Sequence, residues 1–146
     1  MIEAFGKKIV HAGAVGAGDA IKAVNNALLA VHILSAAEGL AVLVKAGVDP
    51  TVALDVINSS SGRSNSSENL IPQRVLTRAF PRTFRLALLE KDIGIAAVMA
   101  DDLKATTPLI SLTAKRFHEA REKLGEAADH VEAVKMVEQE NGVEIK

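Results

Sequence analysis

Cysteine, tryptophan and tyrosine are absent from the 146 residues, and only four phenylalanines are present. Without cysteine, the chain can form neither a disulfide framework nor a thiolate metal site. Without aromatic platforms, it also lacks the surfaces on which single-stranded nucleic acids stack their bases. The core must therefore consist mainly of Ala, Val, Leu and Ile. The lack of cysteine fits a reducing compartment, and we expect the protein to be cytoplasmic.

The sequence also lacks an excess of charge of either sign. Seventeen Lys and Arg are matched by eighteen Asp and Glu, which gives a net charge of −1, and the two signs are interspersed. Proteins that bind nucleic acid through its phosphates need a basic surface. We therefore expect no nucleic-acid partner. The length suits one domain with a core of its own.

One long apolar run, residues 18–46, suits a helix buried on most sides. Its length would span a bilayer, but polar side chains interrupt it, and an acidic residue such as Glu38 costs about 2.5–3.5 kcal/mol at a membrane centre. We therefore expect no membrane span. His32 and Glu38 lack a second pair of side chains at ligand spacing, so no metal site is expected.

Helical patterns continue to the C-terminus, and nothing alternates strands with helices. The fold class is therefore expected to be all-α, with the shorter helices packed around the long N-terminal one. Residues 7–11 are expected to form a short strand or an extended lead-in, for which the rest of the chain offers no partner strand. Helices are expected at residues 18–46, 50–58, from 68 onward, 83–104, 108–125 and 129–139, with the last five residues as a tail.

Apolar positions predict which side of each helix faces the core. The helix at 83–104 would place Phe84 and Lys91 on one face, seven residues apart, with Asp92 beside them. The positions expected to be buried are Val52, Val56 and Ile57; Leu86, Leu89, Ile93, Ala96 and Ala97; Leu109, Leu112 and Phe117; and Val131, Val134 and Val137.

The first turns of the long helix carry Lys22, Asn25 and Asn26. At spacings of three and four residues, these polar groups can converge on one side of the helix. Two interpretations stay open from spacing alone. Lys22 can extend into solvent while the asparagines bridge neighbouring helices, or the three can form part of a functional site. Arg63, in a Ser-rich stretch, can likewise be simply solvated or can bind a carboxylate or phosphate.

The segment GAVGAGDAIKAVNN resembles a motif of the β-hydroxyacid dehydrogenase family, G-x-x-G-x-G-x-x-x-K-x-x-N-N/Q. The similarity continues through AEGLAVLVKAGVDP, NSSSGRSNSS and FRLALLEKDIGIA, and therefore covers nearly the whole chain. Four motifs in the same order are far more specific than any one of them. The SSGR segment resembles 3-hydroxyisobutyrate dehydrogenases more than tartronate semialdehyde reductases.

The resemblance implies an enzyme of two domains. An N-terminal Rossmann domain would hold NAD or NADP, and an all-α C-terminal domain of the 6-phosphogluconate dehydrogenase type would supply catalytic residues and the contact between subunits. Residues 1–13 would be the remnant of the last Rossmann strand and its lead-in, and residues 14–146 the helical domain. A homodimer or higher homo-oligomer is implied, and this chain alone would be inactive.

The resemblance also assigns roles to individual residues. Lys22 matches the catalytic lysine, which would exchange a proton with the hydroxyl group of a small 3-hydroxyacid such as 3-hydroxyisobutyrate. Asn25 and Asn26 would hydrogen-bond this substrate. Phe84 and Asp92 match further substrate-site residues, and Lys91 matches the lysine that approaches the dinucleotide. The alternative is a stand-alone helical dimerisation module without catalysis.

Overall fold

The computed structural model describes residues 9–146, and within that range it contains helices and no strand. The expected all-α class is thus confirmed. Part of the predicted strand at residues 7–11 lies outside the described residues, and residues 9–13 belong to no helix or strand. The elements in chain order are α1 (Ala17–Lys45), α2 (Pro50–Asn58), the π-helix η2 (Ser66–Val75), α3 (Leu86–Asp102), α4 (Pro108–Leu124), the 3-10 helix η3 (His130–Ala133) and α5 (Val134–Asn141).

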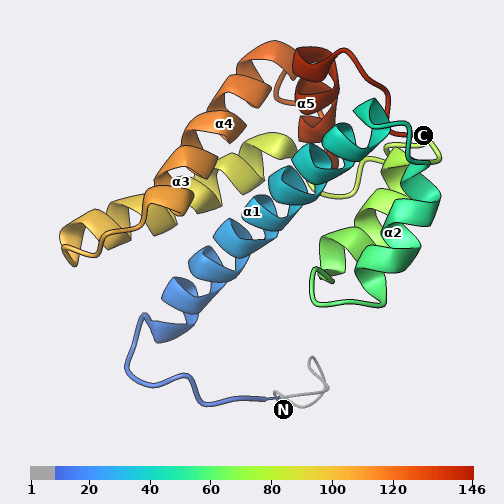
Figure 1. Ribbon diagram of the computed structural model, residues 1–146. Helices are drawn as coiled ribbons and strands as arrows, with labels where there is room; N and C mark the ends of the chain where they lie inside the picture. The colour runs from blue at the N-terminus through green and yellow to red at the C-terminus, as the bar shows by residue number, and fades with distance from the viewer. Residues whose placement is uncertain (1–8) are drawn as a thin grey trace.

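Helix α1 is the axis of the molecule and packs against all the other helices of the described chain. Its 29 residues correspond to about 43 Å at about 1.5 Å per residue. Figure 1 shows α2 on one side of α1, α3 and α4 on the other, and α5 toward its C-terminal end. By length and composition alone α1 could cross a membrane, a property that the central helix of a soluble protein can share.

The buried side of α1 repeats at alternating spacings of four and three residues. Alanine occupies five of these six positions, so the neighbouring helices can approach the α1 backbone closely. The opposite side carries exposed apolar residues, including Ile21 and Val42, which are 58% and 64% exposed. The expectation that this helix is buried on most sides is therefore wrong. The six positions of this series are Ala23, Ala27, Ala30, Leu34, Ala37 and Ala41, and Ile33 and Leu40 are buried beside them.

Helix α2 begins as the sequence predicts but buries a different face. The Asp49 side chain caps it by accepting hydrogen bonds from the backbone N–H groups of Thr51 and Val52 at 2.8 and 3.1 Å. Ala53 and Leu54 face the core, whereas Val52 and Val56 are exposed. The prediction that these two valines are buried is wrong, because both sides of this helix carry apolar residues and the pattern could not distinguish them.

Helix α4 buries the series Thr113, Phe117 and Ala120, spaced by four and three residues. Phe117 is fully buried, as expected. Leu109 and Leu112 were expected beside it but are 66% and 57% exposed, because they line an open hollow against α1 and do not enter the core. The core side of this helix is therefore narrower than its apolar pattern suggested.

Burial of the remaining helices follows the predictions closely, with one exception at the C-terminus. Four expected residues of α3 are buried and Ala97 is half-buried, and the three valines expected in the last helical segment are all buried. The final residues are not a loose tail, since Ile145 is fully buried. Its backbone N–H donates to Glu138 Oε1 at 2.8 Å, and Arg78 Nη2 donates to Glu138 Oε2 at 3.1 Å.

The two sides of α4 predict different responses to truncation. Phe117→Ala is expected to lower the free energy of unfolding by about 3–5 kcal/mol, because it removes a fully buried ring and leaves a cavity. Leu112→Ala on the same helix should change it by about 0.5 kcal/mol or less. Urea denaturation followed by circular dichroism measures both values. Equal losses for the two variants would contradict the burial described here.

Candidate functional site

Helices α1 and α3 bring most of the predicted site residues together. Asn26 on α1 donates from Nδ2 to Asp92 Oδ2 on α3 at 2.7 Å. Lys91 Nζ lies 2.9 Å from Asp92 Oδ1, and Asn25 Nδ2 lies 3.4 Å from Asn26 Oδ1. These four side chains, with Lys22 on the same stretch of α1, form a polar cluster that links two helices distant in sequence.

Asp92 is the buried centre of this polar cluster, with 5% of its surface exposed. Burial alone would raise the pKa of its carboxyl group. Hydrogen bonds from Lys91 and Asn26 and the positive charges of Lys91 and Lys22 outweigh that effect, so the pKa of Asp92 lies below its ordinary value. Asp92 is therefore ionised at neutral pH, and Lys22 lies close enough for its charge to act on it.

The ionised Asp92 also fixes how Asn26 is turned. A carboxylate can only accept hydrogen bonds, so Asn26 must direct its Nδ2 group to Asp92. The Oδ1 atom then faces Asn25 and the surface. At this site Asn26 consequently offers an acceptor, which suits a hydroxyl group or an ammonium group as its partner.

Open apolar hollows lie next to two members of the polar cluster. One, of about 390 Å³, is lined by Ala20, Ile21, Val24, Asn25 and Leu28 on α1. The other, of about 480 Å³, is lined by α3 residues that include Lys91, Ile95 and Val98. Lys22 and Asn25 are exposed, and Asn26 is half-buried. The polar cluster therefore combines a buried anion with cationic and amide groups at the surface, beside apolar surface that could receive a ligand or another part of a protein.

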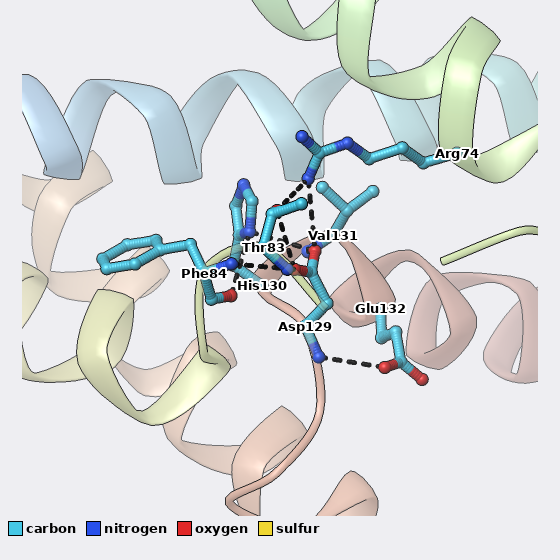
Figure 2. Close-up of polar contacts among 7 residues, drawn as sticks. All are labelled: Arg74, Thr83, Phe84, Asp129, His130, Val131 and Glu132. Atoms are coloured by element: carbon cyan, nitrogen blue, oxygen red, sulfur yellow. Dashed lines mark hydrogen bonds and ion pairs between the residues drawn. The ribbon is translucent and has the colours of Figure 1, made fainter. Parts of the chain in front are cut away.

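Phe84 does not lie on α3, contrary to the prediction. The helix begins at Leu86, and Phe84 precedes it in the loop, half-buried. The expected shared helical face with Lys91 is therefore wrong. No hydrogen bond or aromatic contact recorded for residues 9–146 joins Phe84 to the polar cluster. Phe84 instead belongs to a second group of polar contacts, shown in Figure 2.

Asp129 is the centre of that second group, and its side chain is fully buried. Its Oδ2 accepts from the backbone N–H groups of Thr83 and Phe84 at 2.8 and 3.0 Å. Its Oδ1 accepts from Val131 N–H at 3.1 Å, and Arg74 Nη1 lies 3.5 Å from the same oxygen. Burial would raise the pKa of Asp129, but the donated backbone hydrogen bonds dominate, and the pKa is lowered.

His130 also belongs to this second group, and it contacts the backbone carbonyl oxygen of Phe84. Its backbone N–H donates to Phe84 O at 2.9 Å, and its Nδ1 lies 3.2 Å from the same oxygen and 3.0 Å from Asp129 Oδ1. The sequence alone assigns no functional role to Asp129 or His130. The available signal was the Asp-x-x-Glu spacing of a capping box, which Asp129 and Glu132 form at the start of η3.

The other polar residues considered from the sequence lie away from the polar cluster. Arg63 Nη1 is 3.6 Å from Glu68 Oε1, and both side chains are largely exposed. His32 and Arg63 line a hollow of about 400 Å³ between α1 and the loop after α2. His32 and Glu38 are exposed. Within residues 9–146, no group of three or more His, Asp or Glu side chains is placed to hold a metal ion.

Comparison with known proteins gives one consistent group of relatives. The sequence profile described as "NAD-binding of NADP-dependent 3-hydroxyisobutyrate dehydrogenase" matches residues 16–137. The chain is 34% identical to 2-(hydroxymethyl)glutarate dehydrogenase of Eubacterium barkeri, over 99% of this chain and 48% of that protein. It is 36% identical to 3-hydroxyisobutyrate dehydrogenase of Pseudomonas aeruginosa, over 80% of this chain and 41% of that protein.

Solved structures agree with the sequence relatives. The 3-hydroxyisobutyrate dehydrogenase of Mycobacterium tuberculosis, solved with L-serine, superposes with a TM-score of 0.85 at 28% identity, covering 93% of this chain and 48% of that one. The enzyme of the same name from Salmonella typhimurium gives 0.76 at 30% identity, over 83% and 42% of the two chains. The chain thus spans less than half the length of the relatives described.

The contacts of Asp92 predict how its titration responds to substitution. Lys91→Met should raise the pKa of Asp92, because it removes both a hydrogen bond and a positive charge. Lys22→Met should raise it less, since Lys22 acts through charge alone. Carboxyl ¹³C NMR titration measures the pKa, with Lys45→Met at the far end of α1 as control. An unchanged pKa in Lys91→Met would show that the ion pair does not form in solution.

Proposed function

The chain belongs to the 3-hydroxyisobutyrate dehydrogenase family of β-hydroxyacid dehydrogenases, and from this membership we propose that it is the C-terminal domain of an NAD(P)-dependent oxidoreductase that acts on a small 3-hydroxyacid. The observation that carries the proposal is the Asn26–Asp92–Lys91 arrangement on α1 and α3. This arrangement joins residues from two separate family motifs, and Lys22 lies close enough for its positive charge to act on Asp92. Residues 14–146 would form the helical domain, and residues 1–13 the lead-in from a Rossmann domain.

The proton chemistry is assigned to Lys22. Oxidation of an alcohol requires a base for the hydroxyl proton while hydride leaves the carbon, and reduction requires the same group as an acid. An exposed lysine at the edge of the polar cluster can reach such a hydroxyl group. Asn26 would hydrogen-bond the substrate and keep the path of that proton to Lys22 aligned. The rest of the substrate site would be defined by Asn25, by Phe84 and by the amide group of Asn26, which Asp92 holds in place.

The residues present also fit a dinucleotide. Lys91 is 58% exposed beside an apolar hollow, so its cation is available to a phosphate group while Asp92 holds its position. NAD or NADP, when bound, would supply the hydride acceptor or donor. Most of the dinucleotide site would lie in the Rossmann domain. A 3-hydroxyisobutyrate-like substrate follows from the names of the relatives, and a cytoplasmic location stays a prediction.

A second candidate function, a helical dimerisation module without catalysis, is favoured by the exposed apolar residues. Leu109 and Leu112 on α4 line a hollow with Val31 and Leu34 on α1. Exposed apolar surface of this kind commonly marks contacts with other proteins. Both candidate functions therefore include a homodimer or higher homo-oligomer. They differ in whether the protein catalyses a reaction.

Fusion of this chain to the N-terminal domain of the Pseudomonas aeruginosa enzyme gives a joined enzyme for the test. We expect hydroxyacid-dependent reduction of NAD or NADP, measured by absorbance. Lys22→Ala should lower kcat about 10²–10⁴-fold, because the general acid–base is lost. Lys45→Ala on the same helix is the control. A folded but inactive joined enzyme would support the dimerisation module, and an unchanged kcat in Lys22→Ala would contradict the role of Lys22.

The chain by itself is expected to associate with copies of itself but not to bind the cofactor. Sedimentation should show a dimer or larger species, because the apolar sides of α1 and α4 are open. Calorimetric titration with NAD and NADP should show no binding, since most of the dinucleotide site would lie in the other domain. A strictly monomeric chain would count against both candidate functions, and micromolar cofactor binding would overturn the assignment of the dinucleotide site to another domain.

A further inference from the structure

Both backbone polar groups of Phe84 are held by two adjacent residues, 45 and 46 positions away in sequence. Asp129 Oδ2 accepts from Phe84 N–H at 3.0 Å, and His130 N–H donates to Phe84 O at 2.9 Å. We propose that Asp129 and His130 are positioning residues that fix Phe84 at the substrate site. This proposal rests on the proposed function only for the role of the Phe84 ring. The two residues are called the Phe84 clamp below.

Asp129 accepts more hydrogen bonds than a helix cap requires. Asp49 caps α2 by accepting from two backbone N–H groups, and it remains exposed. Asp129 has a comparable role at η3, where Val131 N–H donates to it. It is nevertheless fully buried and accepts in addition from Thr83 N–H, Thr83 Oγ1 and Phe84 N–H. A buried carboxylate is costly unless such partners surround it, so its extra contacts are specific to the segment that carries Phe84.

His130 holds the carbonyl side of Phe84 with a defined tautomer. Its Nδ1 lies 3.2 Å from Phe84 O and 3.0 Å from Asp129 Oδ1. Both of those oxygens are acceptors, so the hydrogen must be on Nδ1. Burial lowers the pKa of His130 despite the attraction of Asp129, which keeps the imidazole neutral at neutral pH. The rings of His130 and Phe84 also meet edge to face, with centroids 5.5 Å apart.

The clamp leaves the Phe84 side chain free to line a site. In Figure 2 the ring points away from the Asp129 carboxylate and the Arg74 side chain. Phe84 lines a hollow of about 280 Å³ together with Arg82 and Arg85. A further backbone hydrogen bond, from Leu86 N–H to Ala128 O at 2.8 Å, holds the start of α3 to the same segment. The clamp therefore fixes Phe84 relative to α3, which carries Lys91 and Asp92.

The test uses the joined enzyme labelled with 4-fluorophenylalanine, with 3-hydroxyisobutyrate as the substrate. The fluorine resonance of Phe84 is assigned as the one missing from Phe84→Leu. Asp129→Asn weakens the acceptor side of the clamp. His130→Leu removes the Nδ1 contact with Phe84 O and the ring packing, while the backbone N–H of residue 130 can still donate to Phe84 O. His130→Asn retains an N–H donor near the position of Nδ1. Asp101→Asn and His118→Leu, both outside the clamp, are the matched controls. Thermal unfolding verifies that each variant folds, and His130→Leu decides the question if Asp129→Asn does not fold.

We expect the Phe84 resonance to shift or broaden in the clamp variants and to stay unchanged in the controls. The KM for the hydroxyacid should rise about fivefold or more with kcat nearly unchanged, because a displaced Phe84 weakens substrate and transition-state binding equally. His130→Asn should restore much of both values. If Asp129 and His130 only stabilised the fold, the clamp variants would contain a smaller fraction of active enzyme. The apparent kcat would then fall while KM stayed the same.

Two results would overturn the clamp. One is an unchanged Phe84 resonance in the folded clamp variants, and the other is an unchanged KM in those variants when Phe84→Ala raises it. An unchanged KM in Phe84→Ala itself would overturn a different claim, namely that Phe84 lies at the substrate site. A shifted resonance in His130→Leu would in that case still support the clamp as the element that positions Phe84.

Discussion

Close packing along the alanine side of α1 is the constraint on which the rest of the structure depends. A side chain as small as alanine lets α3 and α4 approach the α1 backbone, and the four-and-three spacing keeps that side turned toward them over the helix length. Asn26 belongs to the same stretch as Ala23 and Ala27. Its amide can reach Asp92 at 2.7 Å only because the two helices lie this close. Larger residues at these positions would push α3 and α4 away from α1, and this would separate the members of the polar cluster as well as those of the core.

Two buried carboxylates then connect the helices at particular residues. Asp92 joins α3 to α1 through Asn26, whereas Asp129 joins the segment before α3 to the start of η3. Both remain ionised because hydrogen bonds, and at Asp92 also the positive charges of Lys91 and Lys22, offset the cost of burial. Apolar packing is not directional, and it could tolerate small rotations of α3 about its axis. The two carboxylates restrict such rotations, since each accepts hydrogen bonds from fixed directions.

Local sequence features predicted the helices well, and the burial of individual faces less well. The pair Asp49-Pro50 gave the start of α2, because a cap acts within one turn. Val52 and Leu112 were misplaced because burial depends on which neighbour covers a helix, and the pattern of one helix does not contain that information. Lys22, Asn26 and Asp92 could be associated only through the family motifs. Spacing showed that Lys22 and Asn26 share a side of α1, but it could not place Asp92 opposite them.

The start of α3 shows why Phe84 was misplaced and what its true position implies. Periodicity alone extended the helix back to Thr83, whereas the backbone N–H groups of Thr83 and Phe84 are bound by Asp129 instead of remaining free at a helix end. A distant carboxylate thus holds Thr83 and Phe84 outside α3, which begins only at Leu86. The position of Phe84 consequently depends on residues near the end of the chain. The proposed substrate site therefore includes a residue, Phe84, whose position is determined by residues outside the family motifs.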